Sequence, residues 1–218
     1  MITVITGGSG SGKSAYAEKM VTDFGDLERI YIATMFPFDE ESHQRIARHR
    51  QMRAEKKFST IECYTGLKNL KIPPKSCVLL ECMSNLTANE MFQKDGAGEH
   101  TVEEILEGVR SLQTQAKQLV IVTNEIFSDG ISYDTETQRY ESYLGEINQK
   151  IVGMADCAVE VVYGIPLFFK GNAQKRRTDK WDDCGTVLRL RFRCIPKYPC
   201  RKVNGQKKIC ATLCAFFL

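Results

Sequence analysis

The 218-residue sequence has no apolar run near the roughly 20 residues that a membrane-spanning helix requires. No internal repeat is visible along it. Its first residues enter an apolar, strand-like segment directly, with neither a basic region nor a small-residue cleavage site, so a secretory signal is not expected. These absences make the cytoplasm the expected location, with no membrane span.

None of the nine cysteines belongs to a C-x-x-C pair, which argues against a structural zinc site. Four of them lie within residues 1–174: Cys63, Cys77, Cys82 and Cys157. Three of these sit in or beside apolar, strand-like stretches, where a buried and inert thiol is the better explanation.

The charges divide the chain in two. From Lys175 onward there are 12 basic and 3 acidic residues, which leaves 18 of the 30 basic and 24 of the 27 acidic residues for 1–174. An acidic body therefore precedes a basic segment that also holds five cysteines. The sequence predicts one domain over residues 1–174 and an atypical basic tail over 175–218.

The abrupt change of composition near residue 175 suggests that the tail is the wrong-frame translation of downstream sequence. Reading the coding DNA in its other frames tests this hypothesis, and an intact single frame in close relatives contradicts it. A nucleic-acid-binding tail is the functional alternative, but charge alone supports it and no nucleic-acid partner is expected.

Apolar patterns alternate between strands and helices along residues 1–174. The expected strands are Ile2–Thr6, Ile30–Thr34, Cys77–Glu81, Leu119–Thr123 and Cys157–Tyr163. The expected helices are Ser14–Phe24, Asp39–Arg53, Thr101–Gln115 and Glu136–Ala155, the third with a capping box of Thr101 and Glu104. This alternation predicts an α/β fold with a mostly parallel sheet and helices on both faces.

A glycine-rich segment joins the first strand to the first helix and satisfies G-x-x-x-x-G-K-[ST]. It comprises Gly7, Gly8, Ser9, Gly10, Ser11, Gly12, Lys13 and Ser14. Glycines let backbone N–H groups curl around phosphate oxygens, and the helix adds the positive end of its dipole. The motif and its strand–helix context predict a P-loop NTPase-like fold that binds ATP or GTP, with Lys13 on the β- and γ-phosphates.

The same loop predicts a magnesium ion. The hydroxyl of Ser14 is the expected ligand, and a P-loop site usually adds a carboxylate from the end of another strand. Glu81 closes a buried strand and is the candidate, although a strand-end acid on the surface is a frequent accident. Glu125 ends a second strand in the same way, and the carboxyl ends of strands in such sheets collect ligands.

The expected helix Asp39–Arg53 carries arginines and two histidines. At helical spacing Arg45, His49 and Arg53 line up, with Arg48 beside them. Guanidinium groups around an imidazole disfavour its protonation and leave it nucleophilic, and they would also hold a triphosphate. The alternative is a solvated basic helix with incidental histidines, and the residues alone favour this simpler explanation.

Several separated segments, in order through residues 1–171, resemble one family, the bifunctional adenosylcobinamide kinase / adenosylcobinamide-phosphate guanylyltransferase of cobalamin biosynthesis. The matching segments are Thr6-Gly7-Gly8, Tyr31-Ile32-Ala33-Thr34, Asp39-Glu40, Arg45-Ile46-Ala47-Arg48-His49-Arg50, Thr60-Ile61-Glu62, Leu79-Leu80-Glu81-Cys82, Val122-Thr123-Asn124-Glu125, Gly164-Ile165-Pro166 and Lys170-Gly171. The histidine segment together with the two strand ends is far more specific than the P-loop.

The resemblance implies roles for the candidate residues. Lys13, Ser14 and Glu81 would serve the kinase step, in which a nucleoside triphosphate phosphorylates adenosylcobinamide. His49 would attack the α-phosphorus of GTP and hold GMP until adenosylcobinamide phosphate collects it, and His43 becomes a bystander. The positions that match guanine-nucleotide contacts are Ala33, Thr34, Met35, Arg50, Gln51, Met52, Arg53 and Glu62. A homotrimer is also implied.

The chain departs from the family pattern at two places. After Glu125 many members have a Val-Gly-x-Gly-Ile-Val-Pro-like loop, where this chain has residues 126–133, so corrinoid contacts are not carried over. Family members also generally end close to Lys170-Gly171. Two other functions compete with this prediction: a generic P-loop kinase of small molecules or nucleotides, and a nucleotide-switched binding protein.

Overall fold

The computed structural model describes residues 1–38 and 40–171, without the side chains of Glu41, Ser42, Arg45, His49, Met52 and Ala54. The expected tail of residues 175–218 and its boundary lie outside the described residues. The hypotheses about that tail therefore stay predictions.

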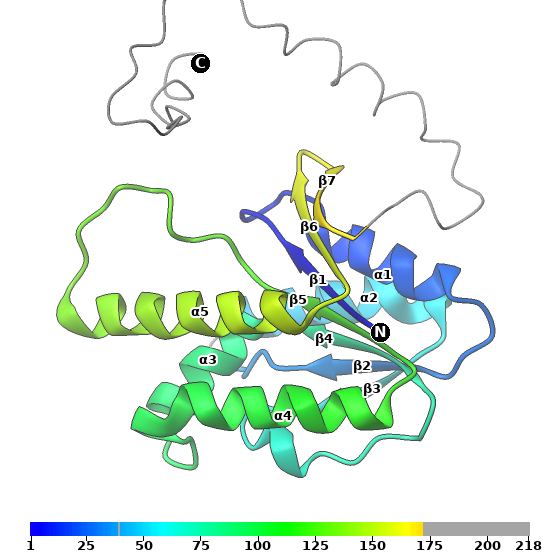
Figure 1. The fold of residues 1–218 in the computed structure, drawn as a ribbon, viewed down its shortest axis with the longest axis horizontal. Helices are drawn as coiled ribbons and strands as arrows, with labels where there is room; N and C mark the ends of the chain where they lie inside the picture. The colour runs from blue at the N-terminus through cyan, green and yellow to red at the C-terminus, as the bar shows by residue number, and fades with distance from the viewer. Residues whose placement is uncertain (39, 172–218) are drawn as a thin grey trace, which may run out of the picture. The chain divides into compact units, whose positions relative to one another are not determined.

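The described chain forms one seven-stranded sheet in the order β3-β2-β4-β5-β1-β6-β7 (Figure 1). Its strands are β1 (Ile2–Thr6), β2 (Arg29–Ala33), β3 (Phe58–Glu62), β4 (Cys77–Glu81), β5 (Gln118–Val122), β6 (Cys157–Val162) and β7 (Ile165–Lys170). Neighbouring strands are parallel except for the antiparallel pair β6–β7. The predicted α/β fold with a mostly parallel sheet is confirmed.

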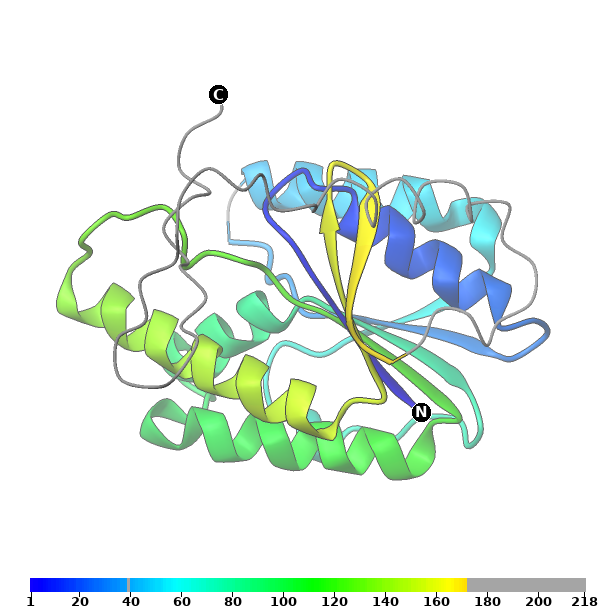
Figure 2. The ribbon, with the colours of Figure 1, turned by 45° about the horizontal axis from the view of Figure 1, so that its top comes forward.

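Helices cover both faces of the sheet, also as predicted. They are α1 (Lys13–Asp23), α2 (Glu40–Arg53), α3 (Met83–Phe92), α4 (Thr101–Gln115) and α5 (Thr135–Met154), with short 3-10 segments η1 (Ala54–Lys56), η2 (Leu67–Asn69) and η3 (Gly98–His100). Figure 2 shows α1 and α2 on one side of the sheet and α3, α4 and α5 on the other. The first and last helices of the described chain therefore lie in different layers.

Alternate residues of each central strand enter different halves of the core, as the pleat requires. In β4, Val78 and Leu80 pack toward α4 and α5, whereas Cys77 and Leu79 pack toward α1. All five residues of β4 are buried. The continuous apolar sequences of the central strands thus follow from burial on both faces.

The sequence analysis missed two strands and one helix. The missed strands, β3 and β7, form the two edges of the sheet and are largely exposed, so a buried apolar run does not mark them. The missed helix, α3, buries polar side chains such as Thr87, Asn89 and Glu90 among its apolar ones. Its pattern is therefore not amphipathic, and tertiary contacts decide its conformation.

The predicted capping box at Thr101 is wrong. Thr101 is already the first residue of α4, and its hydroxyl donates to the carbonyl oxygen of Gly98 at 2.7 Å. The carboxylate of Glu104 instead pairs with the Lys68 ammonium at 2.7 Å. A Ser/Thr-x-x-Glu pattern that begins at the first helical residue, one position after the cap, gives the same sequence signal as a true capping box.

Of the three cysteines in or beside predicted strands, Cys77 and Cys82 are buried free thiols as expected, whereas Cys157 is only half-buried. Cys63 is a buried free thiol as well. None of the helices within the described ranges has the length and apolar content needed to span a bilayer.

Parallel strands bring several polar side chains to one edge of the sheet. The carboxyl end of β1 leads into the glycine-rich loop, and the ends of β4 and β5 lie next in the same direction. The backbone confirms this proximity, because the N–H of Glu125, beyond β5, donates to the carbonyl oxygen of Gly7 at 3.1 Å. The fold thus brings Glu81 and Glu125 to the edge where the loop lies.

Helix α4 approaches η2 so closely that Gly108 has no room for a side chain. A Cβ atom there would stand 2.8 Å from Cβ and 2.9 Å from Cγ of Leu67. We expect Gly108→Ala to lower the free energy of unfolding in urea by about 1–3 kcal/mol, the usual cost of overpacking a core.

The matched control is Gly153→Ala in α5, where nothing lies within 4 Å of the added atom. There the change is expected to raise stability by about 0.5–1 kcal/mol, since alanine is the better helix former. Equal effects of the two substitutions would contradict the close packing of α4 on η2.

Candidate nucleotide-binding site

The segment Gly7–Ser14, which we name the phosphate loop, curls back on itself between β1 and α1. The Ser11 N–H donates to the carbonyl oxygen of Gly8 at 3.2 Å, and Gly12, at φ 90°, precedes the first turn of α1. The Lys13 ammonium donates to the Gly8 carbonyl oxygen at 2.9 Å, so the lysine spans the loop. The positive end of α1 therefore opens into the cradle that the sequence predicts.

Two glycines of the loop are required by close backbone contacts. A Cβ atom on Gly7 would lie 2.5 Å from the carbonyl oxygen of Val161, and one on Gly12 would lie 3.3 Å from Cα of Gly164. The loop is thus packed against β6 and the β6–β7 turn by backbone alone.

Burial changes the acid–base behaviour of Lys13, of which only 8% is exposed. Removal from water lowers the pKa of its ammonium below that of an ordinary lysine, and the nearby Cys82 and Glu81 oppose the shift only in part. A phosphate anion in the loop would raise this pKa again, so binding and protonation of Lys13 are coupled.

The predicted magnesium residues meet in the structure. The Ser14 hydroxyl donates to Oε1 of Glu81 at 2.5 Å, and Oε2 of the same carboxylate is buried with no hydrogen-bond partner. A hydroxyl and a carboxylate with a spare oxygen fit a magnesium ion, which takes few protein ligands and completes its shell with phosphate and water. The described residues contain no cluster of three acidic, histidine or cysteine side chains that could cage a metal alone.

Hydrogen bonds hold the ends of β2, β4 and β5 together behind this site. The Thr34 hydroxyl donates to the carbonyl oxygen of Cys82 at 2.8 Å and accepts from its N–H at 2.7 Å. The Cys82 thiol contacts the Ser84 hydroxyl at 3.1 Å, which in turn accepts from the Asn124 side chain at 2.7 Å. The Glu81–Cys82 peptide within this network is cis.

Cys82 is not a competing nucleophile at this edge. Burial raises the pKa of its thiol, and the hydrogen bond to Ser84 only partly offsets that effect. The thiol is therefore protonated near neutral pH and acts as a packing group.

A small cleft, partly open to solvent, lies beside the phosphate loop, and we name it the α2 cleft. It is lined by Tyr31, Ala33, Met35, Ile46, Arg50, Arg53, Thr60, Glu62, Tyr64, Glu81, Cys82 and Asn85. Glu81 belongs both to this cleft and to the Ser14 contact, so the cleft adjoins the phosphate loop.

Arg53 is the most unusual charge in the cleft. Only 6% of it is exposed, its guanidinium carbon lies 3.4 Å from the centroid of the Tyr31 ring, and its Nε and Nη1 atoms have no hydrogen-bond partner. Stacking on the ring offsets part of the cost of burying the cation. The unused N–H groups leave it ready to bind an anion such as a phosphate.

The end of α2 is tied to the helix of the phosphate loop. Lys56, in the 3-10 turn after α2, pairs with the fully buried carboxylate of Glu18 in α1. Arg29 adds a hydrogen bond from Nη1 to the carbonyl oxygen of Lys56 at 2.9 Å. Because a buried charge is costly without its partner, this pair fixes where the last turn of α2 lies.

Glu62 stands at the mouth of the cleft with two partners. Its carboxylate accepts from the Arg50 guanidinium at 2.6 Å and from the Tyr64 hydroxyl at 2.8 Å. Both residues come from elements that the fold brings together, since Arg50 lies in α2 and Glu62 ends β3. A carboxylate held in this way can accept from the N–H groups of a guanine edge.

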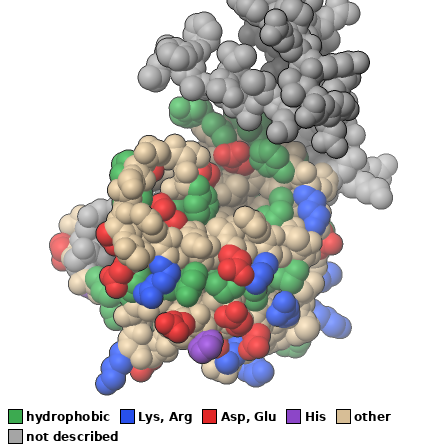
Figure 3. Space-filling view, turned by 60° about the vertical axis from the view of Figure 1, so that its left-hand side comes forward, with side chains coloured by type: hydrophobic (Ala, Val, Ile, Leu, Met, Phe, Trp, Pro, Cys, Tyr) green, Lys and Arg blue, Asp and Glu red, His purple; other side chains and the backbone are tan. Residues whose placement is uncertain are grey.

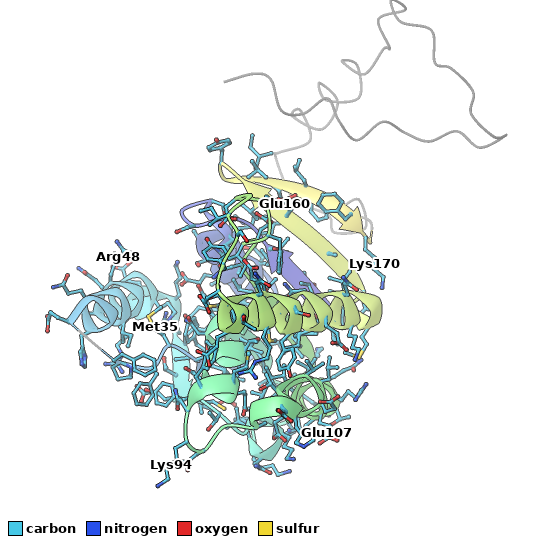
Figure 4. All side chains as sticks on the ribbon, turned by 90° about the vertical axis from the view of Figure 1, so that its left-hand side faces the viewer. Met35, Arg48, Lys94, Glu107, Glu160 and Lys170 are labelled. Carbon is cyan, nitrogen blue, oxygen red and sulfur yellow. The ribbon has the colours of Figure 1, made fainter. Side chains whose placement is uncertain are left out.

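The structure brings many predicted residues together and leaves others apart. Ala33, Met35, Arg50, Arg53, Glu62 and Glu81 line the α2 cleft. Gln51 and Arg48 are exposed, and Figure 4 shows Met35 close to α2 with Arg48 on its outer side. Thr34 is buried and its hydroxyl is bonded to Cys82. Its neighbours Ala33 and Met35 line the cleft, but Thr34 itself does not.

The side chains of His49 and Met52 lie outside the described residues, and their assignments stay predictions. Sequence reasoning missed Tyr31, Tyr64 and Asn85, which also line the cleft. Tyr31 could have been found from its place in a buried strand next to Ala33. Nothing in the sequence marks Tyr64, which follows an edge strand.

Taken together, a phosphate loop between a central parallel strand and a helix, with a strand-end carboxylate on its serine, defines a P-loop nucleotide-binding protein. Comparison with known families identifies the particular family within this class. The family described as "Cobinamide kinase / cobinamide phosphate guanyltransferase" matches residues 3–169. The chain belongs to this family and is an enzyme of its class. The resemblance seen in the sequence is confirmed.

Relatives span most of the chain. A protein of Escherichia coli strain K12, "Bifunctional adenosylcobalamin biosynthesis protein CobU", is 31% identical over 184 residues, covering 78% of this chain and 100% of its own length. Its namesake in Salmonella typhimurium is 29% identical with the same coverage. CobP of Pseudomonas aeruginosa is 28% identical over 78% of this chain and 98% of its own length.

Among solved structures, the flagellar accessory protein FlaH from Methanocaldococcus jannaschii aligns with a TM-score of 0.45 and 12% identity. The alignment covers 82% of this chain and 82% of FlaH.

The lowered pKa of Lys13 predicts how ATP binding depends on pH. Only the protonated ammonium attracts phosphates, so affinity is expected to be full below the lowered pKa and to fall as pH rises through it. The fall should begin at a lower pH than an ordinary lysine near 10.4 would give. ATP titrations between about pH 7 and 10 measure it.

The control is Lys13→Met, whose weaker binding should lack this decline. If the variant and the original chain lost affinity in parallel, another group would be responsible.

Proposed function

We propose that this enzyme phosphorylates adenosylcobinamide with a nucleoside triphosphate and then transfers GMP from GTP to the product through a histidine of α2. The observation that carries the proposal is the position of Glu81. Its carboxylate accepts from Ser14 in the phosphate loop at 2.5 Å, and the same residue lines the cleft that holds Arg50 and Arg53. Membership of the cobinamide kinase family supplies the substrate class.

In the proposed kinase step, the phosphate loop holds the triphosphate while Lys13 neutralises charge on the transferring group. Ser14 and Glu81 would hold a Mg²⁺ ion, which would offset the negative charge of the phosphates when bound. The substrate hydroxyl oxygen forms the new bond to the γ-phosphorus, and the bond to the β–γ bridging oxygen breaks. The hydroxyl proton leaves to solvent or to a nearby carboxylate.

In the proposed transfer step, an imidazole nitrogen of His49 forms a bond to the α-phosphorus of GTP. The bond from that phosphorus to the α–β bridging oxygen breaks, and pyrophosphate leaves with the electron pair. A phosphate oxygen of adenosylcobinamide phosphate then attacks the same phosphorus and displaces the imidazole. Arg53, with its unpartnered N–H groups, is suited to the charge that builds on the phosphate.

Helical spacing supports the choice of His49. The described residues of α2 that line the cleft are Ile46, Arg50 and Arg53, which define one face of the helix. Position 49 falls three residues after Ile46 and four before Arg53, so it belongs to that face. His43 falls three residues before Ile46, two turns further from Arg53 and from the phosphate loop.

The guanine of GTP is proposed to occupy the α2 cleft near Glu62. Its carboxylate already accepts two hydrogen bonds and could exchange one for the guanine edge. Glu62, Arg50 and Arg53 would thus give the cleft its preference for a guanine nucleotide. The homotrimer implied by the resemblance stays a prediction.

Two alternatives remain distinguishable. A generic P-loop kinase needs the phosphate loop but gives His49 no chemistry. A nucleotide-switched binding protein predicts slow hydrolysis without a small-molecule acceptor, and partner binding that weakens steeply with salt.

Replacement of Glu81 tests the magnesium site. Glu81→Gln keeps the shape of the side chain but removes the charge beside Ser14, so the Mg²⁺ concentration needed for half-maximal kinase activity should rise by about 10–100-fold. The measurement is the kinase rate against Mg²⁺ concentration at saturating ATP. An unchanged Mg²⁺ requirement would show that the carboxylate does not support the ion.

A second experiment tests the histidine. Incubation with GTP labelled at the α-phosphorus should leave acid-labile, alkali-stable label on the protein, because a phosphoramidate forms. His49→Ala should abolish this labelling while largely sparing the kinase step.

The matched control is His43→Ala, which lies in the same helix and should label normally. Labelling that survives in His49→Ala but not in His43→Ala would assign the nucleophile to His43 instead. If the original chain is not labelled at all, the generic kinase is favoured.

A further inference from the structure

The turn between β6 and β7 is fixed to the phosphate loop. The Gly164 N–H donates to the carbonyl oxygen of Ser11 at 2.8 Å, and Cα of Gly164 lies 3.3 Å from where a Cβ of Gly12 would be. The carbonyl oxygen of Val161, in β6, lies closer still, 2.5 Å from where a Cβ of Gly7 would be. Whatever the turn presents to solvent is therefore held in a constant position relative to bound phosphates.

Tyr163 occupies this turn, with an exposed fraction of 93%, the highest of any large apolar or aromatic side chain among the described residues. Its backbone is left-handed at φ 51°, a conformation that costs free energy for any residue other than glycine. Neither packing nor a hydrogen bond explains an aromatic ring there. A ligand that covers the ring would.

The magnesium residues indicate which way a nucleotide runs across the loop. Ser14 and Glu81 would hold an ion that offsets charge on the terminal phosphates, so the γ end would point toward β4. The α-phosphate, ribose and base then extend away from β4. In the strand order β4-β5-β1-β6-β7, that direction leads to the β6–β7 turn.

We propose that the ring of Tyr163 stacks on the base of the nucleoside triphosphate that donates phosphate in the kinase step. This inference rests on the proposed function of the phosphate loop. Every base offers a π-face, so stacking would accept adenine and guanine alike. The kinase step should then tolerate either purine, in contrast to the guanine-selective α2 cleft.

The same hairpin exposes Ile165, Phe168 and Phe169, which makes a second copy of this chain the competing occupant. Figure 3 shows acidic and basic side chains interspersed over one face of the molecule, without a large region of one sign. The charge distribution of that face therefore does not indicate a protein partner. The contact between the β6–β7 turn and the phosphate loop favours a nucleotide as the occupant.

The test compares ATP with inorganic tripolyphosphate, which has the phosphates but no base, in calorimetric titrations of the full chain with Mg²⁺. Tyr163→Ala should weaken ATP binding by about 5- to 100-fold, the range for losing one base–aromatic stack, and leave tripolyphosphate binding unchanged. Tyr163→Phe should bind ATP as the original chain does. Alanine meets the same left-handed backbone as tyrosine, so strain is matched.

The control is Phe169→Ala, another exposed aromatic position of the hairpin, which should not affect ATP binding. Equal losses for ATP and tripolyphosphate in Tyr163→Ala would make the residue a support of the loop and overturn the proposal. Unchanged ATP binding in Tyr163→Ala would also overturn it. If sedimentation then shows that this variant forms a smaller assembly, the ring belongs to an interface between copies of the chain. If the original chain binds neither compound, the phosphate-loop function itself fails.

Discussion

The hydrogen bond between Ser14 and Glu81 joins the two halves of this molecule's chemistry. It connects the first turn of α1, which follows the glycine-rich loop, to the end of β4, which forms a wall of the α2 cleft. A parallel sheet makes the contact possible, because β1 and β4 both deliver their carboxyl ends to the same edge. Without it, a phosphate cradle and an arginine-lined cleft would be two unrelated features.

Several buried charges around this contact are incompletely paired. Oε2 of Glu81, Oε1 of Glu18 and two nitrogens of Arg53 have no hydrogen-bond partner. Such groups are costly in a protein interior, so Glu81 and Arg53 are candidates for completion by a ligand. We propose a cation for Glu81 and an anion for Arg53.

The fold and the phosphate loop could be predicted from sequence because both follow from local patterns. Continuous apolar runs identified the buried strands β1, β2, β4, β5 and β6, and the spacing of Gly7, Gly12 and Lys13 identified the cradle. The edge strands β3 and β7 could not be found in this way, since exposure removes the pattern. Helix α3 escaped because its buried Asn89 and Glu90 are satisfied by residues outside the helix, whereas Thr87 bonds to the carbonyl oxygen of Met83 within it.

The cleft depended on a different kind of information. The resemblance supplied Arg53 and Glu62 as nucleotide contacts, yet only the structure shows Arg53 stacked on Tyr31 and Glu62 held by Tyr64. Likewise, no local signal shows that the turn holding Tyr163 and Gly164 lies against the loop, because the contact joins Gly164 to Ser11, about 150 positions earlier. Hydrophobic periodicity reports only local structure, so it cannot predict long-range backbone contacts of this kind.

We propose that a metal ion held at Ser14 and Glu81 lies close to the phosphorus that a histidine of α2 attacks. Phosphorus NMR of the guanylylated enzyme, with Mn²⁺ in place of Mg²⁺, measures this proximity directly through paramagnetic broadening. We expect a phosphoramidate resonance that Mn²⁺ broadens strongly, and we expect this broadening to be lost in Glu81→Gln. A resonance that stays sharp with the ion bound would separate the cleft from the loop and contradict it.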